Sequence, residues 1–225
     1  MRNPWNAVWW RAQRALRSLW RKQDHGALIR QLLADVEAGR PQLFVETGCG
    51  LSTLALAEVA QRVGALLYSC DTNEEKIAEL RRRSGDALRE VRFLVGDSLA
   101  SLAQIAAQHE RVDFALLDSA PSATHTLREF LLLEPRLGPG SRVLIDNAAL
   151  PGARLLLSPC RKGKLLVPYL LASPFWRVTG HPRAGDSMVS AVHDSAGTRS
   201  DPRYEDPEYV DAWRATFERG LPPVR

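Results

Sequence analysis

Short apolar runs alternate with amphipathic segments from residue 42 to residue 146, and this alternation constrains the fold more than any other feature of the chain. The apolar runs predict strands at residues 42–46, 65–71, 90–96, 111–118 and 141–146. The segments between them predict helices at residues 52–62, 73–84, 98–109 and 124–136. The middle strands are apolar at successive positions, as expected when helices cover both faces of a parallel sheet. We therefore expect an α/β fold with a doubly wound, Rossmann-like sheet.

The pattern changes after residue 146. A helix is predicted at residues 164–173, followed by strands at 175–181 and 187–194. The link between these two strands is too short for a crossover connection, so the pair should be antiparallel. Further helices are predicted towards the ends of the chain, over residues 5–22, 27–37 and 207–219. The expected organisation is an N-terminal helical lid or oligomerisation segment (1–40), a ligand-binding domain (41–195) and a C-terminal linker and helix (196–225).

The net charge of +4 is concentrated at the N-terminus, where residues 1–22 carry basic side chains and no acid. The rest of the chain is close to neutral, which argues against a nucleic-acid partner. Trp and Arg side chains fall on opposite faces of the predicted helix at 5–22, which suits a lid, a homodimer helix or peripheral contact with a membrane. The three cysteines lack metal-ligand spacing, and no segment resembles a membrane span or a signal peptide. We expect a cytoplasmic protein.

A pair of glycines follows the first predicted strand, in the stretch LFVETGCGLST (43–53). Gly48 and Gly50 lack Cβ atoms, so the backbone there can turn sharply and let a ligand approach closely. Ser52 or Thr53 is the expected cap of the next helix, whose free N–H groups favour an electronegative ligand group. A tight turn without a ligand is the alternative interpretation.

Acidic residues end the next two strands. Asp71 follows Gly50 by 21 residues, and a carboxylate in this position can accept hydrogen bonds from ribose hydroxyls. Asp97, followed by Ser98, ends the third strand and suits an adenine amino group, although it also suits a helix N-cap. Because ligands of open parallel sheets bind beyond the carboxyl ends of the strands, these positions together predict a nucleotide-like ligand.

The segment from Glu46 to Ser52, the acid Asp71 and the triplet at 96–98 together resemble class I S-adenosylmethionine-dependent methyltransferases. The resemblance covers residues 42–194 and implies a seven-stranded sheet in the order 3-2-1-4-5-7-6, with an antiparallel last pair. It also implies S-adenosylmethionine as the cofactor, and these residues as its site: Glu46, Gly48, Gly50, Ser52, Asp71, Asp97, Ser98 and Asp118. Ser52 replaces the usual third glycine. Position 53 is Thr, where a dinucleotide oxidoreductase would need glycine.

A second group of polar residues lies at the ends of the fourth and fifth strands. Asp118 ends the fourth strand, and Asp146 and Asn147 end the fifth. Two carboxylates and an amide at one edge of a sheet supply the oxygen ligands that Mg²⁺ prefers. The alternative is that Asp118 binds no metal and that Asp146 orients a loop.

Residues 116–152 look like the metal-dependent catechol and caffeoyl-CoA type O-methyltransferases, through the LLLE helix, the strand ending in Asp146 and Asn147, and the PG after it. This resemblance implies that Asp118, Asp146 and Asn147 bind the metal. A metal bound to a substrate hydroxyl lowers its pKa and orients its oxygen. The lysine that acts as base in catechol-type enzymes is replaced by Pro121, so we consider His125, besides Asp118, as a catalytic residue.

The sequence thus predicts O-methylation of a small-molecule hydroxyl, with S-adenosylmethionine as donor and Mg²⁺ assistance. N-methylation is an alternative, but the stretch from Asp118 to Pro121 lacks the first proline and the aromatic residue of the Asx-Pro-Pro-aromatic turn. A second alternative is a non-catalytic protein with this fold, held at a membrane or partner by residues 1–22.

Overall fold

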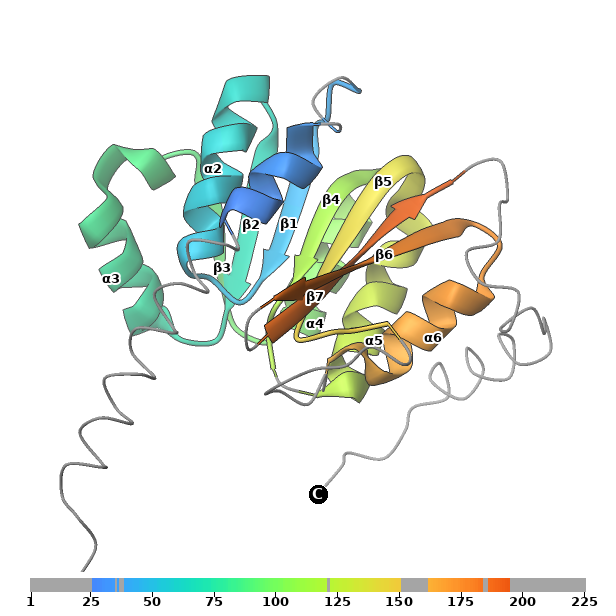
Figure 1. Cartoon of the computed structure of the whole chain (residues 1–225). Coiled ribbons are helices and arrows are strands. Elements are labelled where there is room, and N and C mark those ends of the chain that lie inside the picture. Colours follow the sequence, from blue (N-terminus) through green and yellow to red (C-terminus); the bar gives the residue numbers. More distant parts are fainter. Residues whose placement is uncertain are drawn as a thin grey trace, which may run out of the picture.

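The computed structural model describes residues 26–34, 36, 39–120, 122–150, 162–183 and 186–194. These residues form a seven-stranded sheet in the order β3-β2-β1-β4-β5-β7-β6 (Figure 1). Strands β1 to β5 are parallel, and β7 is antiparallel to both β5 and β6. The predicted fold class and strand order are confirmed. The strands are β1 (Leu43–Thr47), β2 (Leu66–Asp71), β3 (Val91–Val95), β4 (Val112–Leu117), β5 (Leu137–Asp146), β6 (Trp176–Arg183) and β7 (Asp186–His193).

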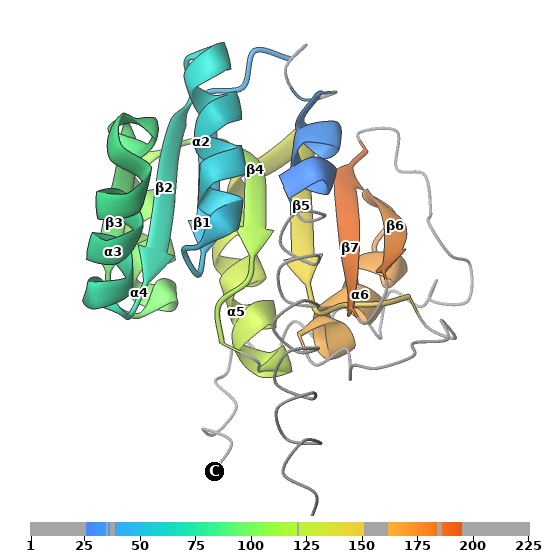
Figure 2. The same cartoon turned by 60° about the vertical axis from the view of Figure 1, so that its left-hand side comes forward.

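Helices cover both faces of this sheet (Figure 2). They are α2 (Leu51–Val63), α3 (Glu74–Ser84), α4 (Ser98–Gln108), α5 (Ala123–Leu133) and α6 (Gly163–Ala172), with a further helical segment at 26–34. Alternate residues of β1 supply the two cores: Leu43 and Val45 pack with the apolar side chains of α4, α5 and α6, whereas Phe44 packs with those of α2 and residues 28–36. This two-sided burial explains why the central strands are apolar at successive positions.

Two boundaries differ from the predictions by three residues or more. Helix α5 ends at Leu133 and continues as a 3-10 turn over Glu134–Arg136, because Pro135 has no N–H to donate and its ring excludes a further α-helical turn. Strand β5 begins at Leu137 rather than at residue 141, and its pairing with β4 shifts register between Val112 and Phe114. The short extension precedes the strand that carries Asp146 and does not alter its carboxyl end.

The segment at 26–34 packs against the sheet domain, since Ile29 and Leu33 are fully buried beside α2.

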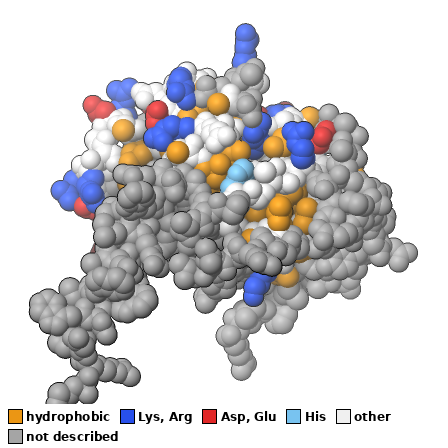
Figure 3. Space-filling view, viewed as in Figure 1, with side chains coloured by type: hydrophobic (Ala, Val, Ile, Leu, Met, Phe, Trp, Pro, Cys, Tyr) orange, Lys and Arg blue, Asp and Glu red, His pale blue; other side chains and the backbone are white. Residues whose placement is uncertain are grey.

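The predicted helices at 5–22 and 207–219, together with Pro121, lie outside the described residues. Within the described part of the chain, no helix is both long and apolar enough to cross a membrane. On the face shown in Figure 3, the described Lys and Arg side chains lie at several separate places rather than in one patch.

Strands β1 to β5 all run in the same direction, so their carboxyl ends meet at one edge of the sheet. Thr47, Asp71, Leu117 and Asp146 are the last residues of four of these strands. The loops that follow them therefore lie beside one another, and residues far apart in the sequence are brought to a single edge.

Candidate functional site

Gly48 forms the turn after β1 and is required there by its backbone and by its surroundings. Its φ is +86°, a left-handed conformation that residues with a Cβ rarely adopt. A Cβ on Gly48 would lie 2.9 Å from the carbonyl carbon of Asp118, closer than real Cβ contacts allow. The Gly48 N–H donates to the Cys70 carbonyl at 2.7 Å. The turn is thus fitted against the chain that leaves β4.

Gly50 has a different role. A Cβ at Gly50 would meet no atom within 4 Å, so the space beside it is open to a ligand. Gly50 is the N-cap of α2, and its N–H donates to Thr53 Oγ1 at 2.8 Å. The prediction that Ser52 or Thr53 is the capping residue is therefore wrong in position, because the helix already begins at Leu51. Thr53 supports the cap from the first turn.

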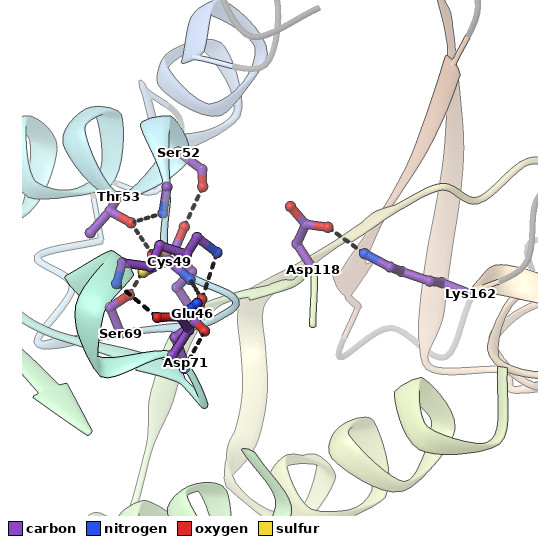
Figure 4. A network of polar contacts seen from close by, with 11 residues as sticks. Glu46, Cys49, Ser52, Thr53, Ser69, Asp71, Asp118 and Lys162 are labelled. Atoms are coloured by element: carbon purple, nitrogen blue, oxygen red, sulfur yellow. Dashed lines mark hydrogen bonds and ion pairs between the residues drawn. The ribbon is translucent and has the colours of Figure 1, made fainter. Parts of the chain in front are cut away.

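The carboxylate of Glu46 is fully buried beneath this turn. It accepts hydrogen bonds from the hydroxyls of Ser52, of Thr53 at 2.6 Å and of Ser69 at 2.7 Å (Figure 4). Burial raises the pKa of Glu46 to about 7, against the lowering effect of the three hydroxyls. Since Ser52 and Glu46 are directed at each other, both hold the glycine turn from below.

The raised pKa of Glu46 predicts a pH-dependent stability. The folded state binds this proton more tightly than the unfolded state, so its contribution is complete below the unfolded pKa of 4.5 and is lost as pH rises through about 7. We expect the free energy of unfolding of the wild type to fall more than that of Glu46→Gln between about pH 5 and pH 8, by up to about 3 kcal/mol. Denaturant titrations of both proteins measure this, and parallel pH profiles would contradict it.

Asp71 ends β2 and is held in place by three donors. Its Oδ2 accepts from the Cys49 N–H at 3.0 Å and from Lys76 Nζ at 2.6 Å, and its Oδ1 accepts from the Asn73 N–H at 2.9 Å. Burial opposes ionisation of Asp71, but the hydrogen bonds from Lys76 and Asn73 outweigh it and lower its pKa. The carboxylate is therefore charged at neutral pH, as an acceptor for ribose hydroxyls should be. Lys76 was not identified from the sequence.

Asp97 and Ser98 lie at the start of α4. Asp97 Oδ1 accepts from the N–H groups of Leu99 at 2.9 Å and Ala100 at 3.3 Å, so Asp97 is the helix N-cap that the sequence left as an alternative. The Ser98 hydroxyl lies 2.7 Å from His125 Nε2, which joins α4 to the first turn of α5. Besides capping α4, Asp97 lines a cavity at the carboxyl edge of the sheet, so it can still contact a ligand.

A cavity of about 310 Å³ lies at the carboxyl edge of the sheet. This volume is at the lower end of the range for small-molecule sites, roughly 300 to 1,000 Å³. Six of the predicted site residues line it: Gly48, Asp71, Asp97, Ser98, Asp118 and His125. Glu46, Gly50, Ser52, Asp146 and Asn147 do not line it. The cavity therefore joins the predicted nucleoside side, around Asp71, to the predicted acceptor side, around Asp118.

The ends of β4 and β5 bring Asp118 and Asp146 to a buried lysine. Lys162 Nζ donates to Asp118 Oδ1 and lies 3.6 Å from Asp146 Oδ2, and only 5 % of the Lys162 side chain is exposed. Figure 4 shows this lysine reaching Asp118 from the start of α6. The Asn147 Nδ2 donates to Asp146 Oδ2 at 2.6 Å, so the amide presents a donor to the carboxylate.

The predicted Mg²⁺ site is not supported by this arrangement. The ammonium of Lys162 forms ion pairs with both carboxylates that were expected to bind the metal. The described residues also contain no group of three or more His, Cys, Asp or Glu side chains that could hold a metal ion. As these side chains stand, the set is a paired lysine and two carboxylates rather than an open set of oxygen ligands.

Lys162 was not predicted as a site residue, because the catechol-type pattern places its lysine three residues after the first acid, where this chain has Pro121. One signal was present: Lys162 lies two residues before the predicted helix at 164–173, close to a helix N-terminus, where a positive charge opposes the helix dipole. Burial and the neighbouring Asp146 carboxylate raise the pKa of Asp118 to about 7, against the lowering effect of Lys162.

His125 lies in the same cavity but is part of a network behind it. Its Nε2 is 3.4 Å from Oε1 of the fully buried Glu129, which also accepts from the Ser119 hydroxyl at 2.6 Å. The hydrogen bond to Glu129 raises the pKa of His125, against the effect of burial. Because its Nε2 already faces Ser98 and Glu129, His125 is less well placed than Asp118 to accept a proton from a molecule in the cavity.

With this geometry in place, residues 45–148 match a family whose model is described as a methyltransferase domain. This segment, 104 of the 225 residues, is similar to that family. It spans the glycine turn, Asp71, Asp97, Asp118 and Asp146, and the strand order is that of class I S-adenosylmethionine-dependent methyltransferases. A search of curated proteins found no match to the chain.

Three solved structures share the fold of this chain. An O-methyltransferase from Bacillus cereus in complex with S-adenosylhomocysteine (SAH) is 20 % identical, with a TM-score of 0.59 over 75 % of this chain and 81 % of that one. A proposed O-methyltransferase from Klebsiella pneumoniae is 16 % identical, with a TM-score of 0.62 over 80 % and 89 %. A proposed caffeoyl-CoA O-methyltransferase from Staphylococcus aureus is 17 % identical, with a TM-score of 0.58 over 75 % and 82 %.

Proposed function

We propose that the protein transfers the methyl group of S-adenosylmethionine to a hydroxyl oxygen of a small molecule. The observation that carries this proposal is the single cavity with a charged ribose acceptor, Asp71, on one side and Asp118 on the other. The family match supplies the reaction class, and the neighbours described as O-methyltransferases support oxygen as the acceptor atom.

The donor half of the cavity is built for a nucleoside with a methionine tail. Asp71 accepts hydrogen bonds from the ribose, and Asp97 and Ser98 border the place of the adenine. Gly48 lines the cavity in the turn before α2, and the N-terminus of that helix favours the methionine carboxylate.

The chemical step needs an acceptor oxygen in line with the sulfonium methyl group. The oxygen attacks the methyl carbon, the new C–O bond forms as the S–C bond breaks, and the sulfonium leaves as the neutral thioether of SAH. The hydroxyl proton goes to the Asp118 carboxylate, which is 31 % exposed and faces the cavity. Mg²⁺ is not part of this proposal, because Lys162 is already bound to Asp118.

Asp71→Asn is expected to weaken binding of the donor product. The amide keeps the shape of the side chain but loses the charge that binds Lys76 and would accept the ribose hydroxyls. Losing charge-assisted hydrogen bonds costs about 1.5–3 kcal/mol, so the Kd for SAH should rise roughly 10- to 100-fold. Calorimetric titration with SAH measures this, with Glu74→Gln, an exposed acid in the first turn of α3, as the control.

The activity itself is tested by methyl transfer to a panel of catechols, other phenols and sugars, with labelled S-adenosylmethionine. Weaker binding of SAH by Asp71→Asn than by the wild type, together with product on at least one hydroxyl acceptor, is the expected result. No heat with either S-adenosylmethionine or SAH would overturn the proposal. Product formed only on amines would move the reaction to N-methylation.

A further inference from the structure

Lys162 occupies a position that local physics disfavours. It is the N-cap of α6, where the helix dipole repels a positive charge and where Ser, Thr, Asp or Asn is preferred. Its side chain is only 5 % exposed, and a buried ammonium is costly unless it is paired. Such an unfavourable placement indicates that the charge has a functional role. The ammonium of Lys162 contacts Asp118 and Asp146, so the role is expected there.

Close packing holds the start of α6 in this position. A Cβ on Gly163 would lie 3.0 Å from the Ala148 Cα and from Val167 Cγ2, so only glycine fits there without a shift. Ala148 is fixed in turn, because its N–H donates to the Ser187 carbonyl of β7 at 3.1 Å. The first turn of α6 thus packs closely against the loop that follows β5. This packing fixes the backbone of Lys162, whose side chain points at the two carboxylates.

Lys162 brings one positive charge to Asp118 and Asp146, whereas a divalent cation bound to the same carboxylates would bring two. A smaller positive charge suits a site that must hold a sulfonium cation and accept a proton. Lys162 therefore supplies positive charge where a metal would sit, and it leaves Asp118 with acceptor capacity toward the cavity.

We propose that the Lys162 ammonium replaces a divalent cation in this site, so that methyl transfer needs no metal and Lys162 positions Asp118 for the acceptor. The metal-binding part of this inference stands on the contacts of Lys162 alone, whereas the catalytic part rests on the proposed O-methyltransferase function. Lys162 is a positioning residue, because it acts through Asp118.

Binding of Mn²⁺ in the absence of any substrate separates the two parts. Calorimetry and electron paramagnetic resonance are applied to the full chain as wild type, Lys162→Met and Lys164→Met; Lys164 is an exposed lysine two positions further along α6. We expect the wild type and the Lys164 variant to bind no Mn²⁺. Lys162→Met should bind one ion per chain, because the ammonium that pairs with the two carboxylates is then removed.

Turnover gives the second readout. Wild-type turnover should be unchanged by EDTA. Without metal, the turnover of Lys162→Met should fall at least about tenfold, as expected for loss of a charged partner worth about 1.4 kcal/mol or more. Mn²⁺ should restore part of this turnover. Lys162→Arg, which keeps the charge, should bind no Mn²⁺. If Lys162→Met does not fold, Lys162→Gln replaces it, since the amide keeps a polar tip for the buried carboxylates.

Stoichiometric Mn²⁺ binding by the wild type, or loss of its turnover in EDTA and recovery with Mg²⁺, would overturn the inference. A folded Lys162 variant without charge that still binds no Mn²⁺ would also overturn it. If no acceptor is ever methylated, the proposed function fails, but the Mn²⁺ titrations still decide whether Lys162 holds the cation position.

Discussion

Gly48→Ala is expected to abolish measurable SAH binding and to lower the stability of the protein. A Cβ at φ +86° stores strain of about 1–3 kcal/mol, which should lower Tm by roughly 2–4 °C for each kcal/mol in a domain of this size. The same Cβ would collide with the carbonyl group of Asp118, so the turn and the end of β4 must move apart. Both walls of the cavity then shift.

We expect the Kd of Gly48→Ala for SAH to rise by more than about 100-fold, equivalent to roughly 3 kcal/mol. Gly64→Ala is the matched control, since Gly64 has a φ of +74° but a Cβ there meets no atom within 4 Å. The control should lose stability from the backbone strain alone and bind SAH as the wild type does. Calorimetry and thermal unfolding of the three proteins test this. Equal affinity in Gly48→Ala and the wild type would contradict the close-approach argument.

Asp118→Asn is expected to have the largest effect on turnover. The amide has nearly the same shape and can still accept a hydrogen bond from Lys162, but it cannot take the hydroxyl proton. Loss of a general base typically costs about 10²- to 10⁴-fold in rate, so kcat should fall within this range. The Kd for SAH should change by less than about threefold, or roughly 0.7 kcal/mol, because the donor half of the cavity is intact.

Single-turnover rates and SAH titrations separate these two effects, with Asp86→Asn in the exposed turn after α3 as the control. A kcat within tenfold of the wild type would remove Asp118 from the role of base. His125→Gln would then be the next variant to measure, because His125 is the other titratable group predicted as catalytic that lines the acceptor side.

The strand order and the edge of the sheet that carries the site could be predicted because both follow from local pattern. Parallel strands end at one edge, so Gly48, Asp71 and Asp118 must lie near one another once their strands are recognised. What the sequence could not show is the direction of each side chain. Ser52 turns down to Glu46 instead of toward the cavity, because a buried carboxylate beneath the turn needs hydroxyl donors.

Lys162 shows more clearly what could not be predicted from the sequence. It lies 44 residues from Asp118 in the sequence, on a helix whose position depends on the contact between Gly163 and Ala148. No periodicity or spacing encodes that contact. The prediction of metal ligands was sound in bringing Asp118, Asp146 and Asn147 to one place, and it failed to anticipate that the chain carries its own cation to them.

The backbone contact between Gly48 and Asp118 has a consequence for how ligands bind. The Asp118 N–H also donates to the Thr47 carbonyl at 3.0 Å, so the turn after β1 and the end of β4 form one rigid unit. A molecule that immobilises one side therefore immobilises the other before its own ligand arrives. Reciprocity of binding free energies then predicts that the proposed methyl donor and acceptor bind cooperatively, each raising the affinity of the protein for the other.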